Sequence, residues 1–507
     1  MDCVSHFHLS PFTFHLSPSL FHIVYPRNMK RIAVVPEGQC VEISSPYHFR
    51  VDVVSPKSGK TIRGGRSVPA TLQPCNSATS QPSPDHVFRF LAPHYHGDGT
   101  RCRELLVKMT VYEPGRPKRV VSKLYIPPRS KDAKVCLGMT PEQLRANPCN
   151  RAILSNGSGA ASQVRAGWGE IASQYDAILA ANPNPDVPSD RVNVWSRTRC
   201  WLQREGYTRQ LDKRCETAFN VDPAGKGVEW HFHVPCGMGR SASFNFELTL
   251  AEGSNAARLR VTRYAVKDEE DVGDQVRLVF RPDIEWRSYH ATTKAYLNDV
   301  QKRFHESCRP VADGVEFFPY GGKFSLHVKN GVYHHEPQWE YNIAHAEEAA
   351  RGQDGSGDLF SPGWISADLK PGESMEIIGD CFIPSPRTNH QPPTTYTWGI
   401  ENFPSVSTLS FGEAMRRAIE LYIVKRDNLK TVIAGYPWFL DWGRDTFIFM
   451  RGMIAAGRIA DSLKILKAFA AFEENGTLPN IIYGKTAGNR DTTDAQLWFV
   501  RCVEEIS

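Results

Sequence analysis

Phe244-Asn-Phe-Glu-Leu-Thr-Leu250 and Arg258-Leu-Arg-Val-Thr-Arg-Tyr-Ala-Val266 are two short runs in which apolar and polar side chains alternate. Successive side chains of a β-strand point to opposite faces, so each run predicts a strand with one apolar face. The aromatic and β-branched residues in both runs favour strands as well. The two runs therefore predict neighbouring parts of an antiparallel β-sandwich.

The same pattern continues on both sides of these runs, from about Ile32 to about Asn402. Further alternating runs lie at residues 49–54, 105–112, 120–125, 275–280 and 375–382. Gly, Pro and Asn bound these runs, and Pro-rich loops separate them. We therefore expect residues 29–402 to form an N-terminal region rich in β-sandwich, interrupted by one helix at 141–146 with Thr140 as its N-cap.

The first 28 residues differ from this region. They are rich in His, Pro and Ser, and the sequence His-Leu-Ser-Pro occurs at 8–11 and again at 15–18. Histidines interrupt the apolar residues and no basic segment precedes them, so the stretch does not have the pattern of a signal peptide. We expect residues 1–28 to be unstructured, or Met29 to be the true start.

After Thr408 the apolar spacing changes to that of helices. Residues 411–425, 444–456 and 458–474 carry apolar side chains three and four positions apart, and Gly457 stands where a helix C-cap glycine would. A fourth helix is expected to start at Thr492 or Thr493 and run to the terminus. Residues 403–507 are thus predicted to form helical hairpins.

The overall composition limits the function classes. A chain of 507 residues is too long for one core, which predicts a multidomain protein. Lys+Arg 60 against Asp+Glu 55 gives a net charge of only +5, which argues against nucleic acid as a partner. No apolar run reaches the ~18 residues of a spanning helix, so no membrane partner is expected. The 12 cysteines are scattered without a C-x-x-C pair, which indicates reduced thiols and a cytoplasmic location.

Three weaker motifs do not predict a metal or cofactor site. His231 and His233 with Cys236 lack an evident fourth ligand, and His334-His335-Glu336 is no stronger. Ser155-Asn-Gly-Ser-Gly159 lacks the Lys-Ser/Thr of a phosphate loop, so it predicts a turn. We expect no metal and no cofactor.

The most unusual segment is Ala434-Gly-Tyr-Pro-Trp-Phe-Leu-Asp-Trp-Gly-Arg-Asp-Thr446, at the start of an expected helix. Trp438 and Trp442 offer flat apolar faces suited to sugar rings, and Arg444 and Asp445 offer donors beside an acceptor, suited to paired hydroxyls. The alternative is an aspartate at a helix start together with buried aromatic residues.

This segment, together with Asp494-Ala-Gln-Leu-Trp-Phe499, resembles the paired signature of the amylo-alpha-1,6-glucosidase domain of bacterial-type glycogen debranching enzymes. Leu478-Pro479-Asn480, between them, resembles the family's loop ahead of the acidic motif. The resemblance is strongest over residues 431–499 and fainter over 281–296 and 339–363.

The resemblance implies an (α/α)6 toroid behind a β-sandwich, and an inverting glycoside hydrolase that removes alpha-1,6-linked glucose at branch points of glycogen or another branched alpha-glucan. Inversion needs an acid and a base with ~6.5–9.5 Å between their carboxyl groups. By motif position Asp494 is the general acid. The implied glucose-binding residues are Tyr436, Trp438, Asp441, Trp442, Arg444, Asp445 and Trp498.

Two features depart from the family. Asp491 stands where the family usually has Asn, so it is a lower-ranked alternative to Asp494, whose other possible role is to stabilise the first helical turn. The family's base is a Glu on a later helix pair, and the chain ends at Ser507. Glu504 would lie ~15 Å along the helix from Asp494, too far for the pair. We therefore expect an incomplete toroid that is inactive alone, or that a separate polypeptide completes; the alternative is a glucan-binding fragment without catalysis.

Overall fold

The computed structural model describes residues 20–24, 33–34, 40–56, 58–66, 68–69, 86–94, 103–126, 137–222, 225–264, 271–273, 275–383, 409, 411–436, 438–491 and 494–507. The chain divides into two units. One is Met1–Val135 with Ser410–Gly412, and the other is Cys136–Leu409 with Glu413–Ser507. The expected β-sandwich-rich region at 29–402 contributes residues to both units.

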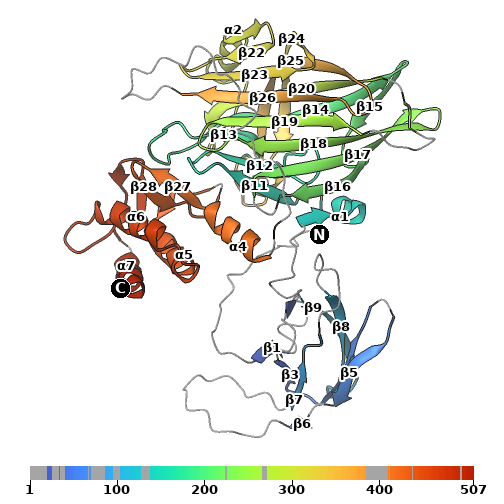
Figure 1. Cartoon of the computed structure of the whole chain (residues 1–507), viewed down its shortest axis with the longest axis vertical. Helices are drawn as coiled ribbons and strands as arrows, with labels where there is room; N and C mark the ends of the chain where they lie inside the picture. Colours follow the sequence, from blue (N-terminus) through green and yellow to red (C-terminus); the bar gives the residue numbers. More distant parts are fainter. Residues whose placement is uncertain are drawn as a thin grey trace. The chain divides into compact units, whose positions relative to one another are not determined.

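The first unit contains two small sheets (Figure 1). One has the order β1 (Leu20–Val24), β3 (Cys40–Ser45), β7 (His86–Leu91), β6 (Val68–Pro69), and the other β2 (Ala33–Val34), β9 (Lys118–Ile126), β8 (Arg103–Val111), β4 (Phe49–Val54), β5 (Thr61–Arg66). Leu105, Val107 and Met109 of β8 alternate into the core, as the sequence pattern predicts. β1 lies inside the segment expected to be unstructured and pairs in parallel with β3; the two His-Leu-Ser-Pro repeats lie outside the described residues.

The second unit is dominated by a large antiparallel sandwich, drawn in teal to light orange in Figure 1. The nine-stranded sheet has the order β10 (Leu137–Met139), β16 (Glu216–Val221), β17 (Gly227–Gly237), β18 (Arg240–Leu250), β19 (Ala256–Arg263), β26 (Ser374–Phe382), β23 (Lys323–Lys329), β22 (Gly314–Phe317), β21 (Cys308–Val311). The eight-stranded sheet has the order β11 (Arg151–Ser155), β12 (Ala161–Arg165), β13 (Ala177–Ala181), β14 (Val192–Arg204), β20 (Val276–Ser288), β25 (Ser356–Leu369), β24 (Val332–Ala344), with β15 (Tyr207–Leu211) paired to β14.

The alternating apolar residues of the run at 244–250 fill part of the core between these two sheets. Phe244, Phe246 and Leu248 of β18 are buried, and the Phe246 ring lies 5.7 Å from that of Phe280 on β20. The predicted strand at 244–250 is confirmed within β18, and the run at 258–266 is confirmed as far as Arg263, where β19 ends; residues 265–266 lie outside the described part. The two strands pair in antiparallel register. The sequence thus predicts two neighbouring strands of the nine-stranded sheet.

Among the described residues, three short helices lie in the connections between the sandwich strands. α1 (Pro141–Ala146) has the predicted bounds, and Thr140 forms a capping box in which its backbone N–H donates to Gln143 Oε1 at 2.8 Å. The sequence did not predict α2 (Val300–Glu306) and α3 (Ala346–Ala349), which are too short to show helical periodicity.

The C-terminal part of this unit contains α4 (Phe411–Glu420) from Glu413 onward, the hairpin β27 (Ile423–Arg426) and β28 (Leu429–Val432), and β29 (Asp441–Trp442). It continues with α5 (Gly443–Ala455), α6 (Ile459–Ala470), β30 (Ile481–Tyr483), β31 (Thr486–Ala487) and α7 (Ala495–Ile506). Gly457 has φ +77°, as expected for a C-cap glycine. The expected starts of the fourth helix, Thr492 and Thr493, lie outside the described residues.

One helix prediction was too long. The helix expected at 411–425 ends at Glu420, and Ile423 to Lys425 belong to strand β27. β-Branched Ile423 and Val424 favour a strand, and Asp427, with φ +48°, makes the turn to β28.

The β27–β28 hairpin joins the helices to the sandwich (Figure 1). Val424 and Ile433 are buried in a cluster with Ala161 of β12 and Tyr436. The backbone N–H of Lys425 donates to the Gly157 carbonyl at 2.9 Å, so the segment at 155–159, predicted to be a turn, is part of this contact. The sandwich therefore supports the start of the helical part directly.

Glu216, on β16, is a buried carboxyl whose titration should control stability. Burial raises its pKa to about 8, and its side chain accepts a hydrogen bond from the Trp168 backbone N–H. An unfolded glutamate ionises near pH 4.5, so the stabilisation by the folded, protonated group is complete below pH 4.5 and is lost as the pH rises through about 8.

We therefore expect Glu216→Gln to flatten this dependence and to raise the free energy of unfolding at pH 8 by about 2–4 kcal/mol relative to wild type. Urea denaturation at pH 5, 6.5 and 8 measures this, with Glu306→Gln, at an exposed helical position, as the control. Parallel pH profiles for Glu216→Gln and wild type would contradict the assignment.

Candidate active site

The segment at 434–446 forms a loop, the short strand β29 and the first turn of α5. β29 pairs with β30, so that Asp441 lies opposite Ile482 and Trp442 opposite Ile481. The backbone N–H of Gly443 donates to the Asn480 carbonyl at 2.9 Å. The loop at 478–480 is thereby fixed against the start of α5.

Gly443 marks the place where the two sequence motifs meet. A Cβ atom added there would lie 2.7 Å from the Pro479 carbonyl oxygen and 3.4 Å from the Cβ of Ala495. Gly443 is the first residue of α5 and Ala495 is the first residue of α7. The structure therefore brings together the beginnings of α5 and α7, and only a residue without a side chain fits between them.

Three of the predicted site residues are placed at these helix starts. Arg444 and Asp445 lie in the first turn of α5, and their side chains, 44% and 47% exposed, form an ion pair at 3.7 Å. Asp494 is the N-cap residue of α7, but its side chain makes no capping hydrogen bond. The helix-stabilising alternative for Asp494 therefore lacks the contact that an N-cap aspartate normally makes.

Asp494 is partly buried and Asp491 is exposed. Within the described part of the chain, neither carboxylate takes part in an ion pair or a side-chain hydrogen bond. Leu497, in the first turn of α7, is 68% exposed. Both carboxylates thus remain available to a ligand.

Asp441 has a different environment. Its side chain is fully buried, and Arg426 Nε donates to Oδ2 at 2.7 Å while the Thr431 hydroxyl donates to the same oxygen at 3.0 Å. Burial raises the pKa of Asp441 although the Arg426 charge opposes the shift. Arg426 also donates to the Gly484 carbonyl at 2.6 Å. The pair ties β27, β29 and the turn after β30 together beneath the loop.

Trp438 is held by the sandwich. The guanidinium groups of Arg151 and Arg351 lie 5.5 and 5.6 Å from its ring centroid, and the Tyr289 hydroxyl donates to its backbone carbonyl at 3.2 Å. The Tyr175 ring meets the indole edge-on at 6.4 Å. These contacts place Trp438 at the junction between the sandwich and the helical part.

The remaining aromatic candidates are divided between the junction and the helices. Tyr436 is 6% exposed and lies 4.7 Å from the Arg191 guanidinium; burial raises its pKa against the effect of that charge. Trp442 is partly buried and meets Phe439 edge-on at 5.3 Å. Trp498 packs between α7 and α5, with Arg451 over its ring at 5.7 Å.

Several buried polar atoms near the meeting point have no hydrogen-bond partner among the described residues. They are Trp438 Nε1, Trp442 Nε1, Thr446 Oγ1, Asn480 Oδ1 and Gln496 Oε1. Buried polar groups are normally paired with protein or water, so these five atoms can form hydrogen bonds with water or with a polar ligand. The loop, the segment at 478–480 and the start of α7 all contribute.

Sequence reasoning did not identify the supporting residues from the sandwich. Tyr289 and Arg351 lie inside the two segments of fainter family resemblance, so a signal for them existed. Arg151, Tyr175 and Arg191 stand in ordinary strand and loop patterns, and only the fold brings them to the motif. An arginine in a strand has no sequence feature that points to a distant indole.

The weaker motifs have local partners. His231 lies 3.1 Å from the Asn220 amide and stacks on Tyr264, whereas Cys236 is buried. His334 stacks on Trp364. In the parts of the chain that the structure describes, no three His, Cys, Asp or Glu side chains are grouped for a metal ion, and the helices are all too short or too polar to span a bilayer.

Comparison with known proteins gives two family matches. Residues 151–376 match the family "Glycogen debranching enzyme N terminal", and residues 415–506 match the family "Amylo-alpha-1,6-glucosidase". A glycogen debranching enzyme of Saccharomyces cerevisiae is 30% identical over 89 residues, which are 16% of this chain and 6% of the yeast protein. The chain thus spans only a small part of that relative.

Among solved structures, a bacterial glucoamylase complexed with acarbose aligns with 71% of this chain and 56% of its own, at 9% identity and a TM-score of 0.38. The Escherichia coli chaperone DraB aligns with 42% of this chain and 93% of its own, at 11% identity and a TM-score of 0.15. With TM-scores this low, neither structure informs the fold or the function of this chain.

Proposed function

Since this chain belongs to the glycogen debranching enzyme family, we propose that it acts on branched alpha-glucan and hydrolyses the alpha-1,6-linked glucose at branch points. The observation that carries the proposal is the contact of Gly443 with Pro479 and Ala495. It joins the beginnings of α5 and α7, from which Arg444, Asp445 and Asp494 project. A glucose unit at this place would meet charged donors and acceptors together with the Trp442 indole.

In the proposed reaction the Asp494 carboxyl gives its proton to the glycosidic oxygen as the bond to the glucose carbon breaks. A base on the opposite face of the sugar takes a proton from water, which attacks that carbon and inverts its configuration. Arg444 and Asp445 hold ring hydroxyls, and Trp442 contacts the sugar. Trp438, Tyr436, Asp441 and Trp498 keep the loop and the helices in position.

A second candidate function is glucan binding without hydrolysis. The glutamates next to the motifs along the chain all have local partners. Glu473 accepts from Gly476 N–H at 2.6 Å, and Glu474, Glu504 and Glu505 pair with Arg490, Arg501 and Arg451 at 3.3, 2.6 and 2.9 Å. A carboxylate held in an ion pair is a weaker base, which favours this alternative for the described residues acting alone.

Two further parts of the proposal concern the surroundings of the protein. Exposed apolar side chains on the helices, such as Leu463, Leu497 and Val500, favour contact with additional helices, for example on a separate polypeptide. The cysteines whose side chains are described, including the buried Cys200 and Cys381, are unpaired thiols, which favours a cytoplasmic location.

The test is glucose release from a phosphorylase limit dextrin, followed by NMR of the first product. We expect β-glucose to appear before mutarotation, because inversion at an alpha-linkage gives the β-anomer. Release of α-glucose would contradict the inverting mechanism. Absence of release, with dextrin binding that weakens in Trp442→Ala, would favour the non-catalytic alternative.

A further inference from the structure

The outer face of the eight-stranded sheet contains a hollow of about 390 Å³. Trp201 and Arg199 of β14, Arg281 of β20, Trp364 of β25 and Gln338 of β24 line it. Their neighbours along the strands, such as Cys200 and Leu202, point the other way into the core. None of the lining residues belongs to the segments that build the candidate active site.

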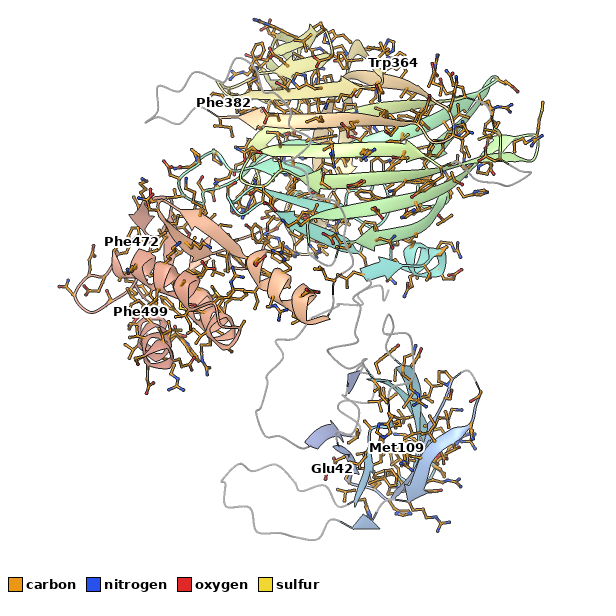
Figure 2. The ribbon with its side chains drawn as sticks, in the orientation of Figure 1. Glu42, Met109, Trp364, Phe382, Phe472 and Phe499 are labelled. Carbon is orange, nitrogen blue, oxygen red and sulfur yellow. The ribbon has the colours of Figure 1, made fainter. Side chains whose placement is uncertain are left out.

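Two tryptophans in this hollow are held in fixed orientations. The His334 ring stacks on Trp364 with centroids 3.8 Å apart and 14° between planes, and Trp364 Nε1 donates to Glu336 Oε2 at 2.8 Å. Trp364 is labelled on the sandwich in Figure 2. The Arg199 guanidinium lies 5.8 Å from the Trp201 ring centroid. Both indoles are partly exposed, so preorganised aromatic surface faces the hollow.

The polar groups between the tryptophans are balanced in charge. Arg199 and Arg281 are direct cross-strand neighbours. Arg199 donates to Asp283 Oδ1 at 2.8 Å, and Arg281 donates to the Gln338 side chain and to the Glu336 carbonyl. Glu340 pairs with Arg199 as well. The Arg281 guanidinium also lies 3.9 Å from the Glu336 carboxylate. Each arginine therefore has a carboxylate beside it, which disfavours a phosphate or nucleic acid ligand and favours a neutral one rich in hydroxyls.

We propose that this hollow is a second carbohydrate site, which binds glucosyl units of an alpha-glucan chain without catalysis. Trp201 and Trp364 contact the apolar faces of the sugar. Arg281, Gln338 and Gln203, which also lines the hollow, exchange hydrogen bonds with its hydroxyls. Its volume lies in the range of about 300–1,000 Å³ usual for small-ligand sites. The ligand class rests on the proposed function. Such a site would keep the chain on a polymer between encounters at its branch points.

The test is binding of linear maltoheptaose, which has no alpha-1,6 bond, to the full chain by titration calorimetry. We expect Trp201→Ala/Trp364→Ala to raise Kd by about tenfold or more, while Tyr296→Ala, at an exposed aromatic residue outside the hollow, leaves it unchanged. Trp201→Phe/Trp364→Phe should retain more binding than the alanine variant. Equal thermal unfolding temperatures show that the fold is intact.

Three outcomes would overturn the proposal: no binding by the wild-type chain, equal Kd values for wild type and Trp201→Ala/Trp364→Ala, or loss of binding in Trp442→Ala alone. The last outcome would assign the sugar to the candidate active site. Failure of the proposed hydrolysis is read separately, from glucose release by a limit dextrin. A chain that binds maltoheptaose through Trp201 and Trp364 but releases no glucose would keep this proposal and reject the hydrolytic one.

Discussion

Arg426→Met is expected to lower the free energy of unfolding by about 3–5 kcal/mol at pH 7, because it leaves a buried carboxylate without its counter-charge. The side chains of Arg426 and Asp441 are 3% and 0% exposed. The same substitution removes the bond from Arg426 to the Gly484 carbonyl, so the loop that carries the candidate site loses two supports at once. Urea denaturation followed by tryptophan fluorescence measures the loss.

The pH dependence of this loss has a defined sign. Burial already raises the pKa of Asp441 against the effect of Arg426, and without the guanidinium the pKa rises further. Protonated Asp441 is tolerated in the folded state, so the loss should be smaller at pH 5 than at pH 7.

The double variant Arg426→Met/Asp441→Leu should recover most of the lost stability, because it removes both buried charges. Arg451→Met serves as the matched control, since Arg451 is 44% exposed in its pair with Glu505 and should contribute less than about 1 kcal/mol. Similar losses for Arg426→Met and Arg451→Met would show that the buried pair has no special role.

Asp494→Asn is expected to reduce glucose release from a limit dextrin by about 10²–10⁴-fold, the usual effect of removing a general acid. The amide cannot donate a proton to the glycosidic oxygen, but it has nearly the same shape, so dextrin binding should change little. The measurement pairs initial rates of glucose release with dextrin affinity for each variant.

A substrate whose leaving group needs no proton distinguishes a general acid from a general base or a binding residue. Fluoride leaves without protonation, so Asp494→Asn should retain most of its activity on α-glucosyl fluoride, whereas loss of the base would abolish both reactions. Asp491→Asn is the matched control, three residues away and exposed. If Asp491→Asn shows the larger loss on dextrin, the acid is Asp491 and the assignment is reversed.

Many strands of the sandwich could be predicted because apolar and polar residues alternate along them. β4 was predicted with its observed bounds, and β18 was found over residues 244–250. The helix α1 was predicted to the residue because Thr140 and Pro141 mark a helix start locally, and the structure adds Gln143 to the cap. Such features depend on neighbours in sequence, which is why sequence alone reveals them.

The errors arise where tertiary contacts decide. The helical spacing of 411–425 continues past Glu420, but burial of Ile423 and Val424 in a hairpin makes them a strand. The sequence made no prediction of the boundary between the two units after residue 135, because strands both precede and follow it. A period of two indicates a strand but does not say to which sheet the strand belongs.

The candidate site was predicted in part. The sequence grouped the loop at 434–446 with Asp494, and the structure brings Gly443 against Ala495. It could not show that the Asp441 carboxylate is buried against Arg426, or that Trp438 lies against arginines from the sandwich. These contacts join residues far apart in the chain, and only the folded structure reveals them.

The junction between the sandwich and the loop also sets an order of events during synthesis. Arg151, Arg191, Tyr289 and Arg351, which contact Trp438 or Tyr436, all precede those residues in the chain. Domains fold as the chain emerges from the ribosome, N-terminal parts first. The sandwich residues that contact the loop are therefore synthesised before the loop, so the loop can close onto strands that are already present.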